Sequence, residues 1–341
     1  MRRVTINDIA KELGIANSTV SRALRDEPTI SAPVKQEVKR AAALMGYVPN
    51  IAARSLRTGR SRIIGLLVRD IRDGLSPEVI PGVEAACAAR DYGLLVCNAG
   101  DDPMQERSYL HTLHQRRVDG ILILTPKSDS PEAYLAITRG TPMVLVDATP
   151  EDFAICAVSV DHVTGLYLST RHLLDLGHRR IAFLCGPLSL SPCANSARGY
   201  ARAMLEAGIP QADHRVVVTE NTGIAAGHDA MLHILRLEPQ PTALAVVSDL
   251  MAAGALEAAR CHGMSLPHDF SIVGYDDIPL GALLSPPLTT VNQDKDRLAR
   301  AAVDLLLDEI QSSEHTHRQV LLKPTLVVRG STAPVPHATE P

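Results

Sequence analysis

The chain has 341 residues, of which 45% are hydrophobic and 21% charged, and its mean hydropathy is +0.04. These values are typical of an ordinary globular protein with two or three domains and a sizeable core. The sequence shows neither an apolar leader segment nor an apolar run of the roughly 18 residues that a membrane span needs. We therefore expect a cytoplasmic protein and exclude a membrane protein.

The net charge of −4 conceals a division along the chain. Residues 1–62 contain 12 Lys and Arg against 5 Asp and Glu, a balance of +7, which leaves −11 for the remainder. Such an asymmetry is typical of a nucleic-acid-binding head joined to a body that does not itself bind nucleic acid.

Neither enzyme motifs nor cofactor motifs are found. The sequence lacks a G-x-S-x-G elbow, a G-x-x-x-x-G-K-[ST] loop, a G-x-G-x-x-G fingerprint and an H-E-x-x-H pair. The six cysteines show no ligand spacing, so we expect reduced, mostly buried thiols. His315 and His317 are expected in an exposed turn rather than at a metal site. We predict no catalytic site, no metal and no cofactor.

The first expected element is a short helix with a defined start and end. Thr5 and Asp8 have the spacing of a capping box, and Gly14 can take the left-handed conformation that ends a helix. Apolar residues recur between them on one helical face, namely Ile6, Ile9, Ala10 and Leu13.

A second short helix is expected from about Asn17 to Leu24, with Val20 and Leu24 facing inward. Two short helices around a glycine turn predict a helix-turn-helix. The outward face carries polar side chains that can bind base edges or phosphates: Asn17, Ser18, Ser21 and Arg22. Arg22 is the best candidate for a bidentate contact with guanine.

A third helix completes the head. Ser31 is its expected N-cap, Pro33 lies in its first turn and Gly46 follows its last residue. Its apolar row is formed by Val34, Val38, Ala42 and Met45. We expect a small three-helix core in a helix-turn-helix domain over residues 1–48.

This segment resembles the LacI/GalR family of bacterial transcriptional repressors. The motifs VTINDIAKELGI, STVSRAL, GYVPN and AARSL occur in the family's order and spacing without gaps. The resemblance implies that the second helix enters the major groove of DNA. It adds DNA contacts at Thr5, Tyr47, Asn50 and Arg54.

Residues 49–62 are expected to form a hinge helix and linker. In the family, the segment that matches Asn50 to Thr58 lies in the minor groove, and Leu56 matches a leucine that wedges between base pairs. A lone helix of about nine residues is unstable in water, so we expect the hinge to fold on DNA.

From Ile63 onward, apolar runs alternate with amphipathic stretches. Continuous apolar strands between helices predict parallel sheets covered on both faces. The strand candidates are too numerous for a single sheet. They lie at 63–68, 93–98, 120–124, 143–147, 180–185, 243–247 and 271–275. The expected fold is a small all-α head and an α/β body of two doubly wound parallel-sheet subdomains.

The family resemblance extends over this body. It rests on the motifs LDLGHRRIAFLCGP, PTALAVVSDLMAAGALEAA and FSIVGYDDIPLGALLSPPLTTVNQ. It implies a fold of the periplasmic-binding-protein type, with an effector-binding and dimerisation domain over residues 63–330. The first subdomain would hold residues 63–160 and 293–325, and the second 161–292 and 326–330.

The end of the chain, residues 331–341, is broken by prolines and lacks a leucine heptad. We expect a disordered tail, and hence a homodimer rather than a tetramer built on a C-terminal coiled coil.

The effector would lie in the cleft between the subdomains, beyond the carboxyl ends of the strands. Asp147 and Asp276 match family positions that accept hydrogen bonds from effector hydroxyls. Arg69 follows the first strand and is a candidate cation for the site. The alternative for Arg69 is a rim or solvent-facing arginine.

Other positions depart from the family pattern. Ser196 replaces an effector-binding arginine, Ser248 replaces an asparagine, and Leu75 and Ser76 replace a common aromatic pair. Thr222 lies where several relatives stack an aromatic ring on the ligand, so the cleft should lack flat apolar faces. The effector therefore stays open among a small sugar, a polyol, a sugar acid and a phosphate.

The sequence predicts an effector-responsive transcriptional regulator, usually a repressor, that binds a near-palindromic DNA operator as a homodimer. The alternative is a metabolite-binding or enzymatic α/β protein whose head binds nucleic acid without specificity. Specific, salt-sensitive binding to a short inverted repeat distinguishes the first from the second.

Overall fold

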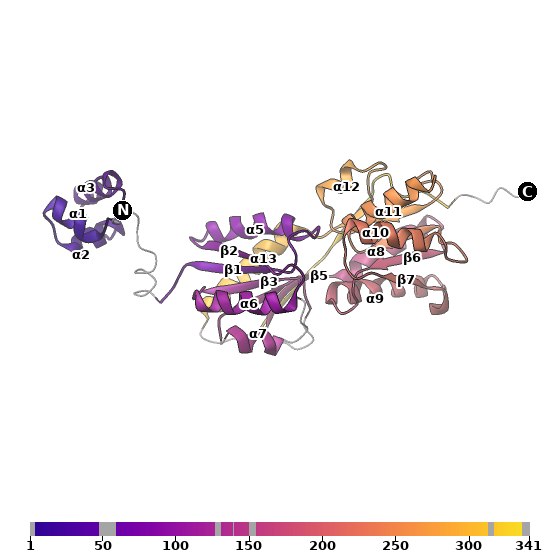
Figure 1. Cartoon of the computed structure of the whole chain (residues 1–341), viewed down its shortest axis with the longest axis horizontal. Helices are drawn as coiled ribbons and strands as arrows, with labels where there is room; N and C mark the ends of the chain where they lie inside the picture. The colour runs from indigo at the N-terminus through magenta and orange to yellow at the C-terminus, as the bar shows by residue number, and fades with distance from the viewer. Residues whose placement is uncertain are drawn as a thin grey trace, which may run out of the picture. The chain divides into compact units, whose positions relative to one another are not determined.

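The computed structural model describes residues 4–47, 59–126, 131–138, 140–149, 155–312 and 317–335. The chain divides into two compact units at Ser61 and Arg62 (Figure 1), which we call the head and the body. The described residues include no helix that is long and apolar enough to cross a membrane.

The head contains α1 (Ile6–Leu13), α2 (Asn17–Leu24) and α3 (Ala32–Leu44). At the start of α1, the backbone N–H of Thr5 donates to the Asp8 carboxylate at 2.8 Å. Gly14 ends α1 at a φ of 64°, a conformation that glycine adopts without steric cost. These local features confirm the predicted helix-turn-helix.

Apolar side chains from all three helices form the core of the head. Ile9, Val20 and Val38 are fully buried, and Leu13, Leu24 and Met45 pack against them. Burial of each large aliphatic side chain contributes about 1.5–3 kcal/mol. This core therefore holds α2 in place and leaves its polar face exposed.

The first subdomain of the body is built on a six-stranded sheet of order β11-β5-β4-β3-β1-β2, with every neighbouring pair parallel. Helices α5 and α13 cover one face, and α6 and α7 cover the other. Alternate residues of β1 and β3 enter the two cores, which explains their continuous apolar runs. The elements are β1 (Ile63–Val68), α5 (Ser76–Ala88), β2 (Gly93–Asn98), α6 (Pro103–Gln115), β3 (Gly120–Leu124), α7 (Pro131–Thr138), β4 (Met143–Val146), β5 (Cys156–Val160), α13 (Lys295–Gln311) and β11 (Gln319–Leu322).

The second subdomain is built on a four-stranded parallel sheet of order β7-β6-β8-β9. Helices α8 and α9 pack on one face, and α10 and α11 on the other. The elements are α8 (His162–Asp175), β6 (Ile181–Cys185), α9 (Ser191–Glu206), the 3-10 helix η1 (Gln211–Asp213), β7 (Arg215–Val218), α10 (Ile224–Ile234), β8 (Ala243–Val246), α11 (Asp249–Cys261), β9 (Ser271–Val273) and α12 (Pro279–Leu283).

The chain crosses between the subdomains after β5, after β10 (Thr290–Asn292), and between β11 and β12 (Thr325–Val327). Strands β10 and β12 pair antiparallel beside the second sheet. After β10, Asp294 adopts a φ of 49° and accepts a hydrogen bond from the Arg297 N–H, which starts α13. Doubly wound subdomains of the predicted type are confirmed.

The prediction of a disordered tail is wrong for residues 331–335. Ser331 is 1% exposed and donates its hydroxyl to the Ile272 carbonyl at 2.6 Å. The N–H of Ala333 donates to Ser271 Oγ at 3.0 Å. Composition did not reveal these hydrogen bonds to the edge strand β9. Residues 336–341 lie outside the described part of the chain.

Candidate functional site

The polar face of α2 is presented to solvent. Asn17, Ser18 and Arg22 are exposed, and Ser21 is half-buried. The Arg22 side chain is 54% exposed, and its Nε lies 3.8 Å from the Glu27 carboxylate. The predicted base-contacting side chains thus share one accessible helical face.

Arg25 lies near this face and was not singled out from the sequence. Its Nε donates to the Ser21 carbonyl at 3.0 Å, and its guanidinium lies 2.9 Å from Glu27. Glu27 is therefore closer to Arg25 than to Arg22. This arrangement leaves the Arg22 guanidinium available to donate hydrogen bonds to two acceptor atoms of a bound partner.

The remaining predicted DNA contacts are only partly described. Thr5 is exposed at the start of α1, and Tyr47 is half-buried against the head core. Burial raises the pKa of Tyr47, so its phenol stays neutral. Asn50, Arg54 and Leu56 lie outside the described residues.

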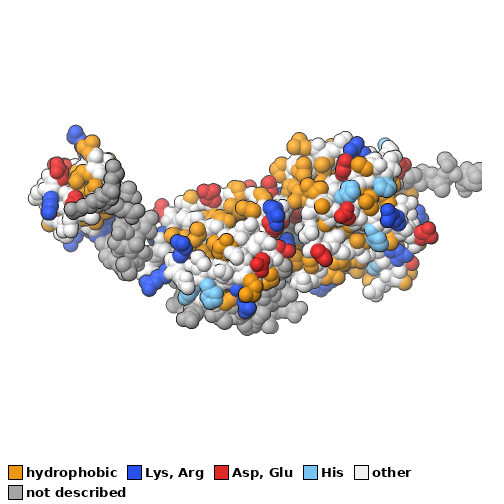
Figure 2. Space-filling view, in the orientation of Figure 1, with side chains coloured by type: hydrophobic (Ala, Val, Ile, Leu, Met, Phe, Trp, Pro, Cys, Tyr) orange, Lys and Arg blue, Asp and Glu red, His pale blue; other side chains and the backbone are white. Residues whose placement is uncertain are grey.

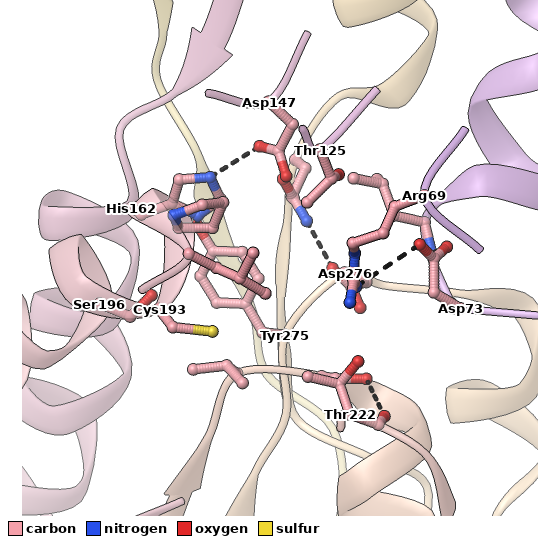
Figure 3. A pocket seen from close by; sticks show the side chains of 17 residues that line it. Arg69, Asp73, Thr125, Asp147, His162, Cys193, Ser196, Thr222, Tyr275 and Asp276 are labelled. Atoms are coloured by element: carbon pink, nitrogen blue, oxygen red, sulfur yellow. Dashed lines mark hydrogen bonds and ion pairs between the residues drawn. The ribbon is translucent and has the colours of Figure 1, made fainter. Parts of the chain in front are cut away.

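A cavity of about 70 Å³ lies between the two subdomains (Figure 3). Its walls follow the carboxyl ends of strands from both sheets, as expected for open α/β folds. Seven of the eight predicted effector-binding residues line it: Arg69, Leu75, Asp147, Ser196, Thr222, Ser248 and Asp276.

Ser76 does not belong to this lining. It is 0% exposed in the first turn of α5, and its hydroxyl donates to the Asp73 carboxylate at 3.1 Å. The backbone N–H of Ser76 donates to the same side chain at 2.6 Å. Ser76 therefore positions Asp73, which lines the cavity itself.

Besides lining the cavity, Ser248 caps a helix. Its hydroxyl accepts the Leu250 N–H at 3.2 Å as the N-cap of α11. It also lies 3.5 Å from the Thr222 carbonyl. The serine hydroxyl caps a helix. Because its side chain is shorter than the asparagine of the family pattern, it extends a hydrogen-bonding group less far into the cavity.

Arg69 is buried, with 9% of its surface exposed, so the alternative of a solvent-facing arginine is wrong. Its guanidinium lies 3.5 Å from Asp101 and 3.9 Å from Asp73. Burial raises the pKa of Asp73, although the charge of Arg69 acts in the opposite direction. Arg69 Nε is buried and has no hydrogen-bond partner within the described residues.

Asp276 is the most strongly perturbed carboxyl group of the cavity. Burial raises its pKa well above the usual range, and the nearby Asp249 adds to this rise. The Gln293 amide donates to its Oδ1, and Lys295 Nζ donates to its backbone carbonyl at 2.6 Å. A carboxyl group that retains its proton can both donate to and accept from a hydroxyl ligand.

A hydrogen-bond chain connects the two walls of the cavity. Tyr275 Oη lies 3.0 Å from His162 Nδ1, and His162 Nε2 lies 2.7 Å from the Asp147 carboxylate. Asp147 follows β4 of the first subdomain, whereas His162 begins α8 of the second. A Cβ atom on Gly165 would lie 2.5 Å from Tyr275 Oη, so the missing side chain leaves room for the phenol.

Several lining residues were not predicted from the sequence, among them Asp73, Thr125, His162, Cys193, Tyr275 and Gln293. Two of them could have been predicted from the sequence, because they directly follow the positions where the chain was expected to cross between the subdomains. His162 follows the crossing at Asp161, and Gln293 follows the one at Asn292. Residues at such crossings necessarily lie near the base of the cleft.

A helix-turn-helix head and a two-subdomain body with a polar cavity define a DNA-binding regulator that carries a ligand-binding domain. Residues 5–50 match the family described as bacterial regulatory proteins, lacI family, and residues 170–332 match the periplasmic binding protein-like domain.

Curated relatives extend this similarity to nearly the whole chain. The ribose operon repressor of Escherichia coli (strain K12) is 34% identical over 328 residues, which cover 96% of this chain and 99% of that protein. The HTH-type transcriptional repressor PurR of Vibrio atlanticus (strain LGP32) is 33% identical over 328 residues, with 96% and 98% covered.

Solved structures agree. The lac repressor dimer bound to operator and the anti-inducer ONPF has a TM-score of 0.88 and 28% identity, and covers 97% of this chain and 100% of its own. A LacI family regulator from Enterococcus faecium with bound ribose has a TM-score of 0.73 and 28% identity, and covers 80% and 100%.

The chain belongs to the LacI family of bacterial regulatory proteins. It is a DNA-binding transcriptional regulator and not an enzyme. The alternative of an enzymatic α/β protein with a nonspecific head is therefore set aside.

Proposed function

We propose that this regulator is a cytoplasmic repressor that binds a near-palindromic operator as a homodimer and responds to a small, neutral, polyhydroxylated metabolite. The observation that carries the proposal is a polar cavity to which both subdomains contribute, in a chain whose head exposes a polar recognition helix. A ligand that contacts both subdomains favours one degree of cleft closure over another.

Recognition of DNA rests on the exposed face of α2. Asn17, Ser18 and Ser21 supply hydrogen bonds to bases or phosphates, and Arg22 supplies the bidentate group that suits the major-groove edge of guanine. Thr5, Tyr47, Asn50 and Arg54 add contacts that position the head. The charge of +7 in residues 1–62 supports binding to phosphates.

A second copy of the chain is the expected protein partner. Helix α12 exposes two large apolar side chains, Leu280 at 36% and Leu283 at 81%. Figure 2 shows hydrophobic side chains gathered over this part of the body. Exposed apolar patches mark interaction surfaces, and a solved relative is described as a dimer. The dimer brings two heads to the two halves of an inverted repeat.

The charges around the cavity favour a neutral ligand. Arg69 already has Asp73 and Asp101 as ionic neighbours, Asp147 is bonded to His162, and burial raises the pKa of Asp276. None of the lining residues is a cation without a carboxylate neighbour. A phosphate or sugar acid would therefore add negative charge to a site already rich in carboxylates.

Two buried atoms define what the ligand should offer. Arg69 Nε is a donor and Gln293 Oε1 an acceptor, and neither has a partner within the described residues. Both residues line the cavity. A hydroxyl group both accepts and donates, so a polyol can pair with each of them. Ribose is the first ligand to test, because one relative is named for the ribose operon and a solved relative holds ribose.

Two measurements on the full-length protein test the proposal. Gel-shift titration against genomic fragments should reveal salt-sensitive binding to one short inverted repeat, and purely sequence-blind binding would refute the operator claim. Calorimetry with ribose, ribose 5-phosphate and ribonate should show binding of the neutral sugar alone. Preferred binding of either anion would overturn the charge argument and leave the operator claim intact.

A further inference from the structure

A second group of chemically reactive side chains lies away from the cavity. Cys156 begins β5, Glu309 lies in the last turns of α13, and His317 precedes β11. Their sulfur, carboxylate and imidazole atoms lie within 4.8 Å of one another. Two segments distant in sequence, one at residue 156 and one at residues 309–317, thus place three different metal-ligating groups together.

The separations suit a small metal ion. Cys156 Sγ lies 3.2 Å from Glu309 Oε1. Ligands of tetrahedral Zn²⁺ bound at about 2.0 and 2.3 Å are roughly 3.5 Å apart, so these two atoms need little movement. The imidazole must approach by up to about 1.3 Å, and an exposed side chain just before a strand can do this.

The surroundings supply both burial and access. Cys156 and Glu309 are 1% and 7% exposed, whereas His317 is exposed and gives an ion a path from solvent. The nearby cation Arg318 donates to Asp308 at 2.6 Å and so has a carboxylate partner outside the three groups. The Arg318 backbone N–H donates to Cys156 Sγ at 3.3 Å, while burial and the Glu309 carboxylate raise the pKa of this thiol to about 11, so the metal-free side chain keeps its proton.

We propose that Cys156, Glu309 and His317 form a binding site for a divalent cation of the zinc class, with one coordination position open to water. A thiolate, an imidazole and a carboxylate together match the ligand preference of Zn²⁺ rather than that of Mg²⁺ or Ca²⁺. Binding converts the Cys156 thiol to a metal-bound thiolate and releases its proton to solvent. The ion joins the end of α13 to the starts of β5 and β11.

Cobalt provides a direct test, because a Co²⁺–thiolate bond gives a charge-transfer absorption in the near ultraviolet that histidine and carboxylate ligands do not give. Full-length protein is treated with EDTA, dialysed and titrated with Co²⁺. We expect this absorption to saturate at one equivalent per chain and to disappear when Zn²⁺ is added. Absence of the absorption at excess Co²⁺ overturns the proposal.

Variants identify the ligands. Cys156→Ser should abolish the absorption, whereas Cys261→Ser, which removes the exposed thiol, should keep it. His317→Asn should weaken Co²⁺ binding at least about tenfold, and His268→Asn, also at an exposed histidine, should not. The His317 comparison stands even if Cys156→Ser fails to fold. Equal affinities of both histidine variants and the unmodified protein would refute the site.

Zinc should also protect the body against heat. An ion that binds only the folded state raises its melting temperature. We expect added Zn²⁺ to raise the melting temperature of the unmodified protein and not that of His317→Asn. Equal stabilisation of both proteins would assign the effect to other groups and contradict the proposal.

Discussion

The exposed face of α2 and the cavity of the body are assembled in opposite ways. The predicted base-contacting residues of α2 lie within six positions, from Asn17 to Arg22, and all but the half-buried Ser21 are exposed. The cavity takes residues from Arg69 to Gln293, and its charged groups are buried. DNA binding therefore depends on groups that a small core leaves at the surface, whereas ligand binding depends on buried groups that long-range folding brings together.

The difference explains how one chain can keep its DNA-binding part and change its ligand. A substitution on the α2 face alters a contact without disturbing the head core. A substitution in the cavity leaves a buried partner unsatisfied, which commonly costs about 1–3 kcal/mol. At Ser248, the departure from the family pattern accordingly comes with a helix cap.

The largest effect is expected at the cavity. Asp276→Ala removes a buried partner of Gln293 and a group that faces the ligand. Effector affinity should fall by about 2 kcal/mol or more, roughly 30-fold, while operator affinity without effector stays near the unmodified value. Operator titrations with and without effector measure both quantities. An unchanged effector response would show that the cavity assignment is wrong, and loss of operator binding would show a structural role.

On the α2 face, Arg22→Ala should reduce operator affinity by about 1–3 kcal/mol and relax preference at one base pair per half-site. Arg40→Ala, at an exposed position of α3, serves as the control and should keep the preference. Binding to a set of single-base operator variants gives the measurement. Equal loss of preference at every base pair would contradict a specific contact by Arg22.

The predicted hinge and linker, residues 49–62, join the head to the body in the sequence. Leu56→Ala should weaken specific DNA binding by about 1 kcal/mol and nonspecific binding less, because a wedge acts only on a kinked site. Effector binding by the body should stay the same. DNA bending assays provide the readout, and unchanged bending would remove Leu56 from this role.

The smallest expected effect is a difference in pH dependence. Burial raises the pKa of Asp249 in the body to about 6, from 3.8. The folded body therefore holds this proton more tightly than the unfolded chain does, and stability falls as pH rises from about 4 to about 6. In the head, a hydrogen bond from Lys39 lowers the pKa of Asp26, so this group contributes in the opposite direction.

Urea unfolding of the body at several pH values from 4.5 to 7 tests the Asp249 effect. The loss of stability with rising pH should be smaller in Asp249→Asn than in the unmodified protein. Asp276 titrates in the same direction, so the comparison concerns the difference between the two slopes. Identical slopes would show that Asp249 does not bind a proton preferentially in the folded state.

Local sequence patterns were sufficient to predict the head and most of the fold. The capping box at Thr5, the turn at Gly14 and the alternating apolar runs each report a structure within a few residues. Cavity residues were predicted from family positions, such as Asp147 and Asp276, and from the place of Arg69 directly after the first strand. Ser76 was misplaced because its match to a family aromatic position does not reveal which way its own side chain turns.

Other features depend on partners far away in sequence. The segment 331–335 is ordered by hydrogen bonds to Ser271 and Ile272, and its own composition suggests a loose tail. His162 is held at the cavity by hydrogen bonds of its imidazole with Asp147 and Tyr275. His317 was expected in a plain turn, and only the fold places it beside Cys156 and Glu309. No local pattern reports such contacts.

The order of strands in the first subdomain has a consequence for synthesis of the protein. The edge strand β11 and the covering helix α13 follow the whole four-stranded sheet of the second subdomain in the chain. Domains generally fold as they emerge from the ribosome, amino-terminal end first. The head can fold once residue 47 has emerged, whereas the first sheet of the body waits for residue 322. A nascent chain therefore has a folded DNA-binding head well before it has a complete ligand-responsive body.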